Sequence, residues 1–379
     1  MNNEDWIQEQ LAGLRARALD RHLLVRTGSE GTVNLCSNDY LGLSIHPAVL
    51  AGATRCLEKY GAGATASRLV TGSLPCHDEL EARLARYKGY QSCLVFGSGY
   101  LANVGALSAL VGRDDHVFLD RLAHASIVDA AVLSRASLHR FRHNDPAHLE
   151  GLLAKCPAKG KRLVVTESVF SMDGDVAPLP DIARAARVSG AMLMVDEAHA
   201  TGVFGSGLVK RHGLEGHVNV SMGTLSKALG GYGGFTACSS DMRELLVNRA
   251  RGFIYTTALP PACAGSALAA LNVLETKPGM GEALLRKAGA FREQLTAAGF
   301  DTLASASQII PVVVGGSEKA LSLSQRLCEE GVLAIPIRPP TVPQGSARLR
   351  LSITSVHTDE DLERAREALI RCAMHEGVI

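Results

Sequence analysis

The sequence has 379 residues, of which 46% are hydrophobic and 20% are charged, and 39 lysines and arginines nearly balance 38 aspartates and glutamates. This length suggests two or three structural units, and the composition is typical of a globular protein and excludes a disordered one. Because the net charge is close to zero, no basic field attracts nucleic acid or an anionic membrane, and we expect a small-molecule substrate.

The nine cysteines are widely spaced and include no CxxC pair. Their spacing and odd number argue against a disulfide framework and a zinc site, so we expect no metal and predict buried, reduced thiols in a cytoplasmic protein. The start, MNNEDWIQEQ, lacks the basic flank and apolar run of a signal or transit peptide. No apolar run reaches the roughly 18 residues that a membrane-spanning helix requires.

The N-terminal segment has a helical pattern. Residues 5–26 alternate apolar and basic positions at helical spacing, TGSEG then marks a break, and VNLCSNDYLGLS is typical of a short strand and turn. We interpret residues 1–45 as an N-terminal arm.

Strand and helix patterns alternate from about residue 75 onward. A helix in CHDELEARLARYKG follows Pro75, and the strand SCLVF then leads through GSG into a helix in YLANVGALSAL. Six further apolar strands follow, in DHVFLD, LHRFRHN, RLVVTES, AMLMVDEAH, HVNVSMG and GFTACSS. This alternation predicts an α/β domain over residues 46–275, with a mostly parallel sheet covered by helices on both faces.

The C-terminal part has a different pattern. A long helical segment follows PPACAGSALAALNVLE, and after it come IIPVVVGG, a helix at 318–330, GVLAIPIRPPTVP, RLRLSIT and a final helix. We therefore predict a smaller α+β domain over residues 276–379.

Polar residues at strand ends are the first candidates for a site, because ligands of open α/β sheets bind beyond the carboxyl ends of the strands. Ser98, Gly99 and Tyr100 follow SCLVF and open a helix, where free N–H groups can bind phosphate, although a tight turn gives the same pattern. Asp196 and His199 follow the apolar run MLMV. A carboxylate there can keep a heterocyclic nitrogen protonated, or it can simply cap a helix.

Lys227 lies between the strand HVNVSMG and the glycine-rich stretch GGYGGF. A lysine in a partly desolvated pocket can lose its proton, form a Schiff base with an aldehyde and act as a base, although most loop lysines are solvated. The flanking hydroxyls of Thr224 and Ser226, with the glycines, favour a site in which a bulky group lies against the backbone.

Together these segments resemble the α-oxoamine synthases, which are fold-type I enzymes that use pyridoxal 5'-phosphate (PLP). The matching segments are SNDYLGL, RLVTGSLPCHDELE, DRLAHASIVDA, TESVFSMDGD, VDEAHATG, GTLSKALGGYGG and RPPTVPQGSARLRLS. The resemblance covers nearly the whole chain and implies a mostly parallel seven-stranded sheet with a smaller C-terminal α+β domain. It also implies a homodimer with shared active sites.

The resemblance implies a role for each cofactor-binding candidate. Lys227 would carry PLP, Asp196 would pair with its ring nitrogen, and His199 would contact its phenolic oxygen. His124, in DRLAHAS, would stack on the ring and, when protonated, polarise a carbonyl of the reacting group. Lys227, Asp196 and His124 would be the catalytic residues. The remaining cofactor contacts would come from Ser98, Gly99, Tyr100, Ser171, Thr224 and, donated by a second subunit, Thr257.

The resemblance also implies substrate contacts. Arg350 in RLRLS would bind the amino acid carboxylate, because a guanidinium offers planar bidentate recognition. Arg348 alternates with it, so both should lie on one face of the sheet, and either could instead be a surface charge. Asn38 would lie near the substrate, and Arg21 is a candidate contact for the acyl group.

The implied reaction joins an amino acid to an acyl thioester and releases CO2 and a thiol. SRLVTG and IRPPTVPQGSARLRLS resemble most closely the branch that uses L-alanine and a pimeloyl thioester, carried by CoA or by an acyl carrier protein. The branch that uses glycine and acetyl-CoA is the nearest alternative, followed by the 5-aminolevulinate and long-chain acyl branches. An aminotransferase and a non-catalytic PLP-binding domain are the alternatives from other classes, whereas a serine acyltransferase is disfavoured because TLSK lacks a partner His and acid at a recognised spacing.

Overall fold

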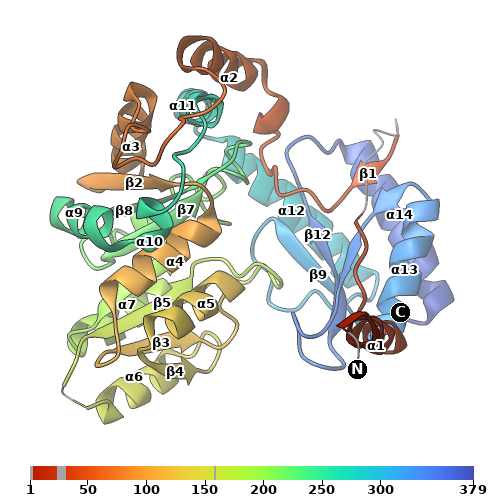
Figure 1. The fold of residues 1–379 in the computed structure, drawn as a ribbon. Coiled ribbons are helices and arrows are strands. Elements are labelled where there is room, and N and C mark those ends of the chain that lie inside the picture. The colour runs from red at the N-terminus through yellow and green to blue at the C-terminus, as the bar shows by residue number, and fades with distance from the viewer. Residues whose placement is uncertain (1–2, 24–30, 158) are drawn as a thin grey trace. The chain divides into compact units, whose positions relative to one another are not determined.

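The computed structural model describes residues 3–23, 31–157 and 159–379. It divides into two compact units (Figure 1). The larger unit comprises Asn38–Ser171 and Asp175–Leu285, and the smaller unit comprises Met1–Ser37, Met172–Gly174 and Arg286–Ile379. No helix within the described ranges is long and apolar enough to cross a membrane.

A seven-stranded sheet forms the centre of the larger unit. In spatial order its strands are β2 (Ser92–Phe96), β8 (Gly234–Cys238), β7 (Val220–Thr224), β6 (Met192–Asp196), β5 (Arg162–Glu167), β3 (His116–Asp120) and β4 (Ser137–Phe141). Only β8 runs antiparallel to its two neighbours, β2 and β7. The predicted mostly parallel sheet is therefore confirmed.

Helices cover both faces of this sheet, as predicted. One hydrophobic cluster joins it to α4 (Gly99–Leu110), α5 (Ala125–Ser134), α9 (Ser240–Arg249) and α10 (Arg251–Ile254). The opposite cluster contains residues of α6 (Pro146–Lys155), α7 (Leu179–Val188) and α8 (Leu208–Arg211). Because the central strands are covered on both sides, they have the continuous apolar sequences of a buried parallel sheet.

The remaining helices of the larger unit are α2 (Pro47–Tyr60), α3 (Pro75–Lys88) and α11 (Pro261–Thr276), and a short 3-10 helix spans Leu43–Ile45. Gly52 of α2 and Gly265 of α11 let these two helices pack closely. A Cβ atom at Gly265 would lie 2.3 Å from the Gly52 carbonyl oxygen, so a larger residue would force the helices apart. Pro75 occupies the first turn of α3, and Gly89 ends the helix with a φ of 80°.

The smaller unit is an α+β structure. Its antiparallel sheet has the order β11 (Ile335–Ile337), β12 (Ala347–Ser352) and β9 (Ile309–Gly315), and β1 (Val33–Asn34) pairs in parallel with β10 (Val332–Leu333). Its helices are α1 (Asn3–Ala16), α13 (Ser317–Glu329) and α14 (Asp359–Glu376), and α12 (Met280–Ala297) continues into it from the larger unit. Thr358 and Asp361 form a capping box that begins α14.

Two expectations from the sequence are wrong. The helix predicted within residues 5–26 ends at Ala16, because Ala18 adopts a left-handed φ of 51°, and residues 24–30 lie outside the described ranges. The cysteines are free thiols, but they are not all buried: Cys328 is exposed, and Cys36, Cys56 and Cys263 are partly exposed.

Candidate active site

Lys227 takes part in a hydrogen-bonded chain with His199. Its Nζ lies 2.8 Å from His199 Nε2, and His199 Nδ1 lies 2.7 Å from the hydroxyl of the fully buried Tyr40. That hydroxyl donates to Asn38 Oδ1 at 3.0 Å. Because Tyr40 has a single proton to donate, Nδ1 of His199 carries the hydrogen and Nε2 accepts from Lys227. The structure therefore brings three predicted residues together and adds Tyr40, which sequence reasoning missed.

Asp196 ends β6, and both of its carboxylate oxygens accept hydrogen bonds. Oδ1 accepts from the Ala198 N–H at 2.8 Å, and Oδ2 accepts from Asn103 Nδ2 at 2.8 Å. The same Asn103 nitrogen donates to Ser126 Oγ at 2.9 Å. Asn103 is buried in the apolar helix α4, and an amide in such a helix is the signal that could have identified it. These contacts fix the position of the carboxylate that we expected to face a ring nitrogen.

His124 caps the N-terminus of α5. Its Nδ1 lies 2.8 Å from Ser126 Oγ, and its backbone N–H donates to Glu167 Oε1 at 2.7 Å. Burial lowers the pKa of His124, while the charge of Asp196 raises it and that of Lys227 lowers it further. This lowered pKa favours a neutral imidazole at His124. Because His124 responds to both charges, the three catalytic candidates lie within electrostatic reach of one another.

The predicted phosphate turn lies at the N-terminus of α4. Ser98 Oγ accepts from the Leu101 N–H at 3.2 Å, and a Cβ atom at Gly99 would lie 3.5 Å from Thr224 Cβ. Thr224 Oγ1 is 2.7 Å from Ser226 Oγ. Free N–H groups at a helix start, flanked by hydroxyls, suit a phosphate group.

A glycine is required beside this turn. A Cβ atom at Gly234 would lie 2.5 Å from the Ser98 carbonyl oxygen and 2.6 Å from the Gly99 nitrogen. This close approach gives the glycine-rich stretch GGYGGF a physical reason.

The other cofactor candidates have different surroundings. Tyr100 is about half exposed, and its hydroxyl donates to Asp129 Oδ2 at 2.7 Å. Ser171 is half-buried in the turn that follows β5. Thr257 is exposed in the segment between α10 and α11, and the next residue, Ala258, donates its N–H to the Ala66 carbonyl at 3.0 Å.

The donor set of this cluster fits PLP. Lys227 offers an amine for an aldehyde, Asp196 offers a buried carboxylate for a ring nitrogen, and the start of α4 offers N–H groups for a phosphate. Asn103 Oδ1, although buried, has no hydrogen-bond partner among the described residues.

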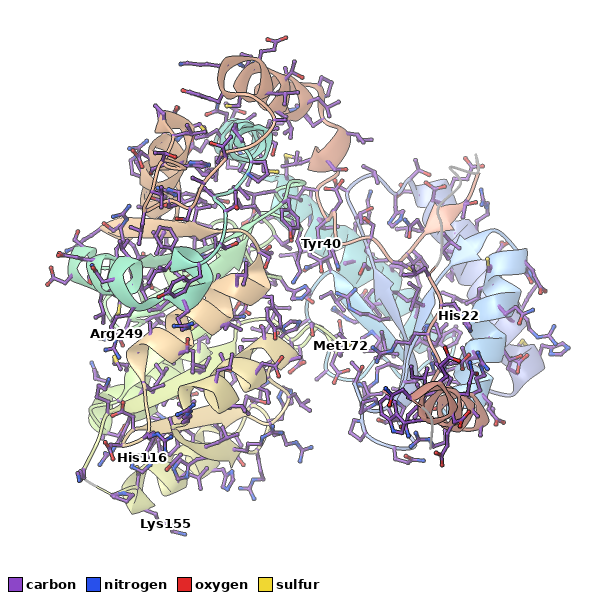
Figure 2. All side chains as sticks on the ribbon, viewed as in Figure 1. His22, Tyr40, His116, Lys155, Met172 and Arg249 are labelled. Carbon is purple, nitrogen blue, oxygen red and sulfur yellow. The ribbon has the colours of Figure 1, made fainter. Side chains whose placement is uncertain are left out.

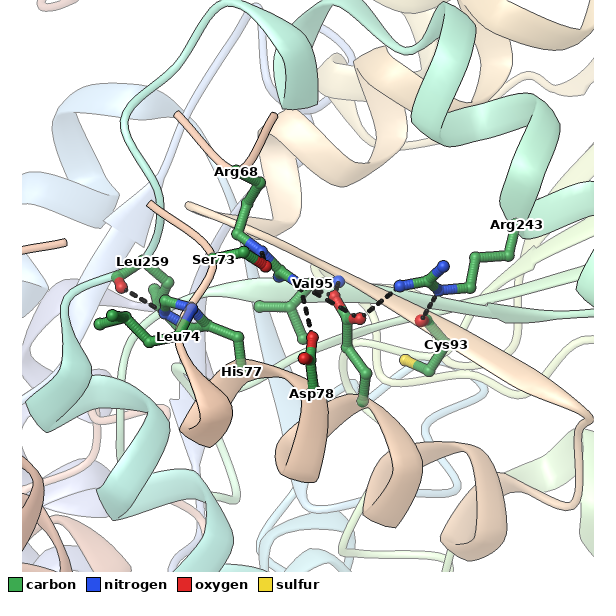
Figure 3. Close-up of polar contacts among 10 residues, drawn as sticks. Arg68, Ser73, Leu74, His77, Asp78, Cys93, Val95, Arg243 and Leu259 are labelled. Atoms are coloured by element: carbon green, nitrogen blue, oxygen red, sulfur yellow. Dashed lines mark hydrogen bonds and ion pairs between the residues drawn. The ribbon is translucent and has the colours of Figure 1, made fainter. Parts of the chain in front are cut away.

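A buried ion cluster holds β2, the strand that leads into the predicted phosphate turn (Figure 3). Glu81 Oε1 accepts from Arg68 and from the Val95 N–H of β2, at 2.8 and 3.0 Å, and Glu81 Oε2 accepts from Arg243 at 2.8 Å. Glu81 is only 4% exposed, so these three donors satisfy a buried carboxylate. Arg68 belongs to SRLVTG, and the contacts of its guanidinium in this cluster are with residues of the scaffold.

A second buried network joins the loops that leave β3, β4 and β5. His143 Nδ1 lies 2.9 Å from Asp120 Oδ1, and its Nε2 lies 2.8 Å from Asp175 Oδ2. Burial by itself would lower the pKa of His143, but the hydrogen bonds to Asp120 and Asp175 outweigh it and raise the pKa to about 9. An imidazolium between two carboxylates therefore holds the turn that follows Ser171.

This network predicts a pH-dependent stability. The folded-state pKa of His143 lies above the ordinary value of about 6.5. The contribution of the protonated imidazole to the free energy of unfolding is therefore complete below pH 6.5 and is lost as the pH rises through 9. The full shift corresponds to about 3.4 kcal/mol, and because the imidazole is partly exposed to solvent we expect urea unfolding to show a smaller loss, of about 2 kcal/mol, between these limits. We expect His143→Gln to abolish most of that loss. The exposed His212 provides the control, His212→Gln, which should keep the full pH dependence. An unchanged slope in His143→Gln would contradict this assignment.

The predicted substrate arginines lie in the smaller unit. Arg350 and Arg348 alternate along β12 between the fully buried Leu349 and Leu351. Arg350 donates to Ser352 Oγ at 2.9 Å, whereas Arg348 forms an ion pair with Asp173. The two arginines therefore have different partners, and the bidentate geometry of a guanidinium at Arg350 is suited to a carboxylate.

Arg21 is exposed and lines a cavity of about 910 Å³ in the smaller unit. Arg338 fixes the backbone beside it by donating to the carbonyl oxygens of Ala18 and Asp20. The apolar residues that line this cavity are Leu19, Leu23, Leu321, Leu333, Ala334, Ile335, Pro336, Ile337 and Pro339. The cavity lining is thus mostly apolar and includes the charged side chains of Asp20, Arg21 and Arg338.

Comparisons with known proteins place this geometry in a family. Residues 30–369 match the family described as aminotransferase class I and II. The 8-amino-7-oxononanoate synthase of Geobacter sulfurreducens is 48% identical to the chain, over 98% of this chain and 99% of that protein.

Two solved structures have the same fold. A serine palmitoyltransferase variant from S. paucimobilis, with PLP and myriocin bound, is 33% identical with a TM-score of 0.93, covering 99% of this chain and 98% of that chain. The 8-amino-7-oxononanoate synthase of Francisella tularensis is 28% identical with a TM-score of 0.80, covering 92% of this chain and 100% of that chain.

Proposed function

The chain belongs to the class I and II aminotransferase family and, within it, to the PLP-dependent α-oxoamine synthases, and on that premise we propose that it joins L-alanine to a pimeloyl thioester. This is the reaction of 8-amino-7-oxononanoate synthase in biotin synthesis. The α-carbon of alanine forms a bond to the thioester carbonyl carbon, the thiol leaves, and the alanine carboxylate departs as CO2. The remaining product is 8-amino-7-oxononanoate.

The observation that carries this proposal is the grouping of Lys227, His199 and Asp196 in a chain whose full-length relatives are named for this reaction. PLP, when bound, withdraws electrons from the bonds at the amino acid α-carbon, which lets that carbon lose a proton or CO2. The protein must therefore hold the cofactor, orient the amino acid and move one proton.

Lys227 is the residue that we propose moves the α-proton of the amino acid. Its Nζ is held 2.8 Å from His199 Nε2, and the Tyr40 and Asn38 contacts keep that imidazole from turning. We propose that Lys227 would hold the cofactor and that its amine, once free, would take the α-proton of alanine and later return one.

Asp196 and His124 serve the cofactor ring. The N–H groups of Ala198 and Asn103 hold the Asp196 carboxylate, which favours a positive N–H facing it. The neutral His124 would lie against the ring face, where a flat imidazole excludes water without adding a competing charge. Ser98, Gly99, Tyr100, Ser171 and Thr224 would complete the cofactor site.

Arg350 is proposed to bind the alanine carboxylate, with Asn38 near the amino acid and Arg21 near the acyl group. We expect Arg350→Lys to raise the KM for alanine about 10-fold or more with a smaller change in kcat, because a lysine lacks the bidentate fork. Steady-state kinetics at varied alanine concentration test this. Arg348→Lys is the matched control, since the Arg348 guanidinium pairs with Asp173, and its KM for alanine should stay near the wild-type value.

The proposed assembly is a homodimer in the cytoplasm, in which Thr257 of one subunit contacts the cofactor of the other. Its exposure and the anchoring of the adjacent Ala258 support a contact of this kind. The acyl donor would be pimeloyl-CoA or a pimeloyl acyl carrier protein. Nothing in the near-neutral charge of the chain favours nucleic acid as a partner.

The test offers PLP-loaded protein two substrate pairs, pimeloyl-CoA with L-alanine and acetyl-CoA with glycine, and follows thiol release. The proposal predicts a kcat/KM for the first pair at least about 100-fold higher than for the second. A preference for glycine with acetyl-CoA would keep the reaction type and overturn the substrates. Binding of PLP without thiol release from either pair would overturn the proposed function.

A further inference from the structure

We propose that His116, His139 and Cys156 form a binding site for a divalent transition metal of the Zn²⁺ class, separate from the PLP site. One ligand atom from each residue lies within 4.8 Å of the other two. Two imidazole nitrogens and a thiolate sulfur are the donor types that zinc prefers in proteins. A water molecule would complete a tetrahedral site.

The spacing of the two imidazoles already suits a shared ion. His116 Nδ1 and His139 Nε2 lie 3.2 Å apart. Two nitrogens bound to one tetrahedral zinc, each at about 2.0–2.1 Å, stand about 3.3–3.4 Å from each other. A sulfur bound to the same zinc at about 2.3 Å stands about 3.6 Å from each nitrogen, so Cys156 Sγ needs to approach the pair by at most about 1.2 Å.

The fold brings the ligands together from three elements. His116 is the first residue of β3, His139 is the middle residue of the edge strand β4, and Cys156 caps the C-terminus of α6. In Figure 2, His116 and the last residue of α6, Lys155, are labelled in the same part of the larger unit. A metal here would therefore tie the edge strand of the sheet to the helix that covers it.

An aromatic contact orients one of the two imidazoles. The Phe118 ring stacks on His139 with centroids 4.7 Å apart and planes 14° from parallel, which fixes the orientation of His139. The stacked ring limits the rotation of His139, so less conformational freedom is lost when its nitrogen binds a metal.

The guanidinium of Arg162, a neighbour of His116 in the sheet, is already engaged. Arg162 is paired with His116 across β3 and β5. Its guanidinium donates to the carbonyl oxygens of Ser189 and Pro157, at 3.1 and 3.2 Å. Binding of a divalent metal breaks the hydrogen bond between the two imidazoles, and the ring that donated it shifts its proton, through solvent, to its other nitrogen. The Cys156 thiol loses its proton to solvent, so the occupied site carries one net positive charge.

This location is distinct from the PLP site. His116 begins β3 and His124 follows the end of that strand at Asp120, so the two lie at opposite ends of a five-residue strand. Such a strand is about 13 Å long. The metal would be structural, and it would not touch the reacting groups.

The experiment titrates chelator-treated, PLP-reloaded protein with Co²⁺, which reports tetrahedral Zn²⁺ sites by its visible absorption. The expected result is one equivalent of Co²⁺ per chain, with a thiolate-to-cobalt charge-transfer band that Zn²⁺ abolishes. Cys156→Ser should remove this band, and His139→Gln should weaken Co²⁺ binding at least about 10-fold. Cys328→Ser, which replaces an exposed thiol of the smaller unit, is the control and should retain the band.

Several results would overturn the site. These are the lack of a charge-transfer band in the wild type, its persistence in Cys156→Ser, its loss in Cys328→Ser, or unchanged affinity in His139→Gln. Circular dichroism and PLP content verify that each variant is folded. If Cys156→Ser fails to fold, His116→Gln replaces it, because the His116 side chain is only partly buried, and its Co²⁺ affinity should also fall at least about 10-fold.

Discussion

Replacing Lys227 with alanine is expected to reduce turnover by at least about 10⁴-fold, because it removes both the covalent attachment of PLP and the amine that moves the α-proton. The visible absorption band of the lysine-linked cofactor should disappear as well. The 2.8 Å contact between Lys227 Nζ and His199 Nε2 is the structural basis for this expectation.

Two controls make the Lys227 result specific. Lys210→Ala removes an exposed lysine whose Nζ donates to a carbonyl of the scaffold, and it should leave kcat within about twofold of wild type. Ethylamine added to Lys227→Ala should restore a measurable part of the rate, since a free amine can enter the space that the side chain leaves. Full activity in Lys227→Ala would contradict the assignment of this residue.

Replacing Asp196 with asparagine is expected to lower kcat by about 10²–10³-fold with little loss of stability. An amide cannot balance a positive ring N–H, yet it has nearly the shape of a carboxylate. Its oxygen can still accept from the Ala198 N–H. Its nitrogen can donate to Asn103 Oδ1, which is buried and has no partner among the described residues, after the Asn103 amide turns over.

The adjacent residue, Glu197, provides a matched control with the opposite outcome. Glu197 is fully buried in an ion pair with Lys88, and it also accepts from Val209 N–H and Ser221 Oγ, each at 2.9 Å. Glu197→Gln leaves the Lys88 charge buried and unpaired, so we expect a loss of about 3–5 kcal/mol in the free energy of unfolding. The rate per folded molecule should change far less than in Asp196→Asn. Equal rate losses in the two variants would contradict the separate roles of Asp196 and Glu197.

Most of the fold could be predicted because the strands of a parallel sheet are short, apolar and separated by helices with clear caps. Pro75 and Gly89 bound α3 in the sequence as they do in the structure. The end of α1 could not be predicted, since it depends on the backbone at Ala18 and on contacts of Arg338 more than 300 positions away. Sequence periodicity contains no such information.

The candidate site was predictable only in part. Lys227, Asp196 and His124 follow strands or lie in motifs, whereas the hydrogen bonds that Tyr40, Asn103 and Ser126 make to site residues became apparent only in the structure. Tyr40 and Ser126 lie in the segments SNDYLGL and DRLAHASIVDA, but a motif does not show which of its side chains contacts the site, and Asn103 lies outside these segments. Similarly, His116, His139 and Cys156 are too far apart in the sequence to suggest a metal, and only the pairing of β3 with β4 reveals their proximity.

The central claim is that the Lys227 site couples acyl transfer to loss of the alanine carboxylate. The most direct measurement supplies carboxyl-labelled [1-¹³C]alanine with pimeloyl-CoA and counts ¹³CO2 and free thiol in the same reaction. Our account predicts one ¹³CO2 for each thiol, both absent in Lys227→Ala. Thiol release without ¹³CO2, or conversion of alanine to pyruvate without thiol release, would contradict it.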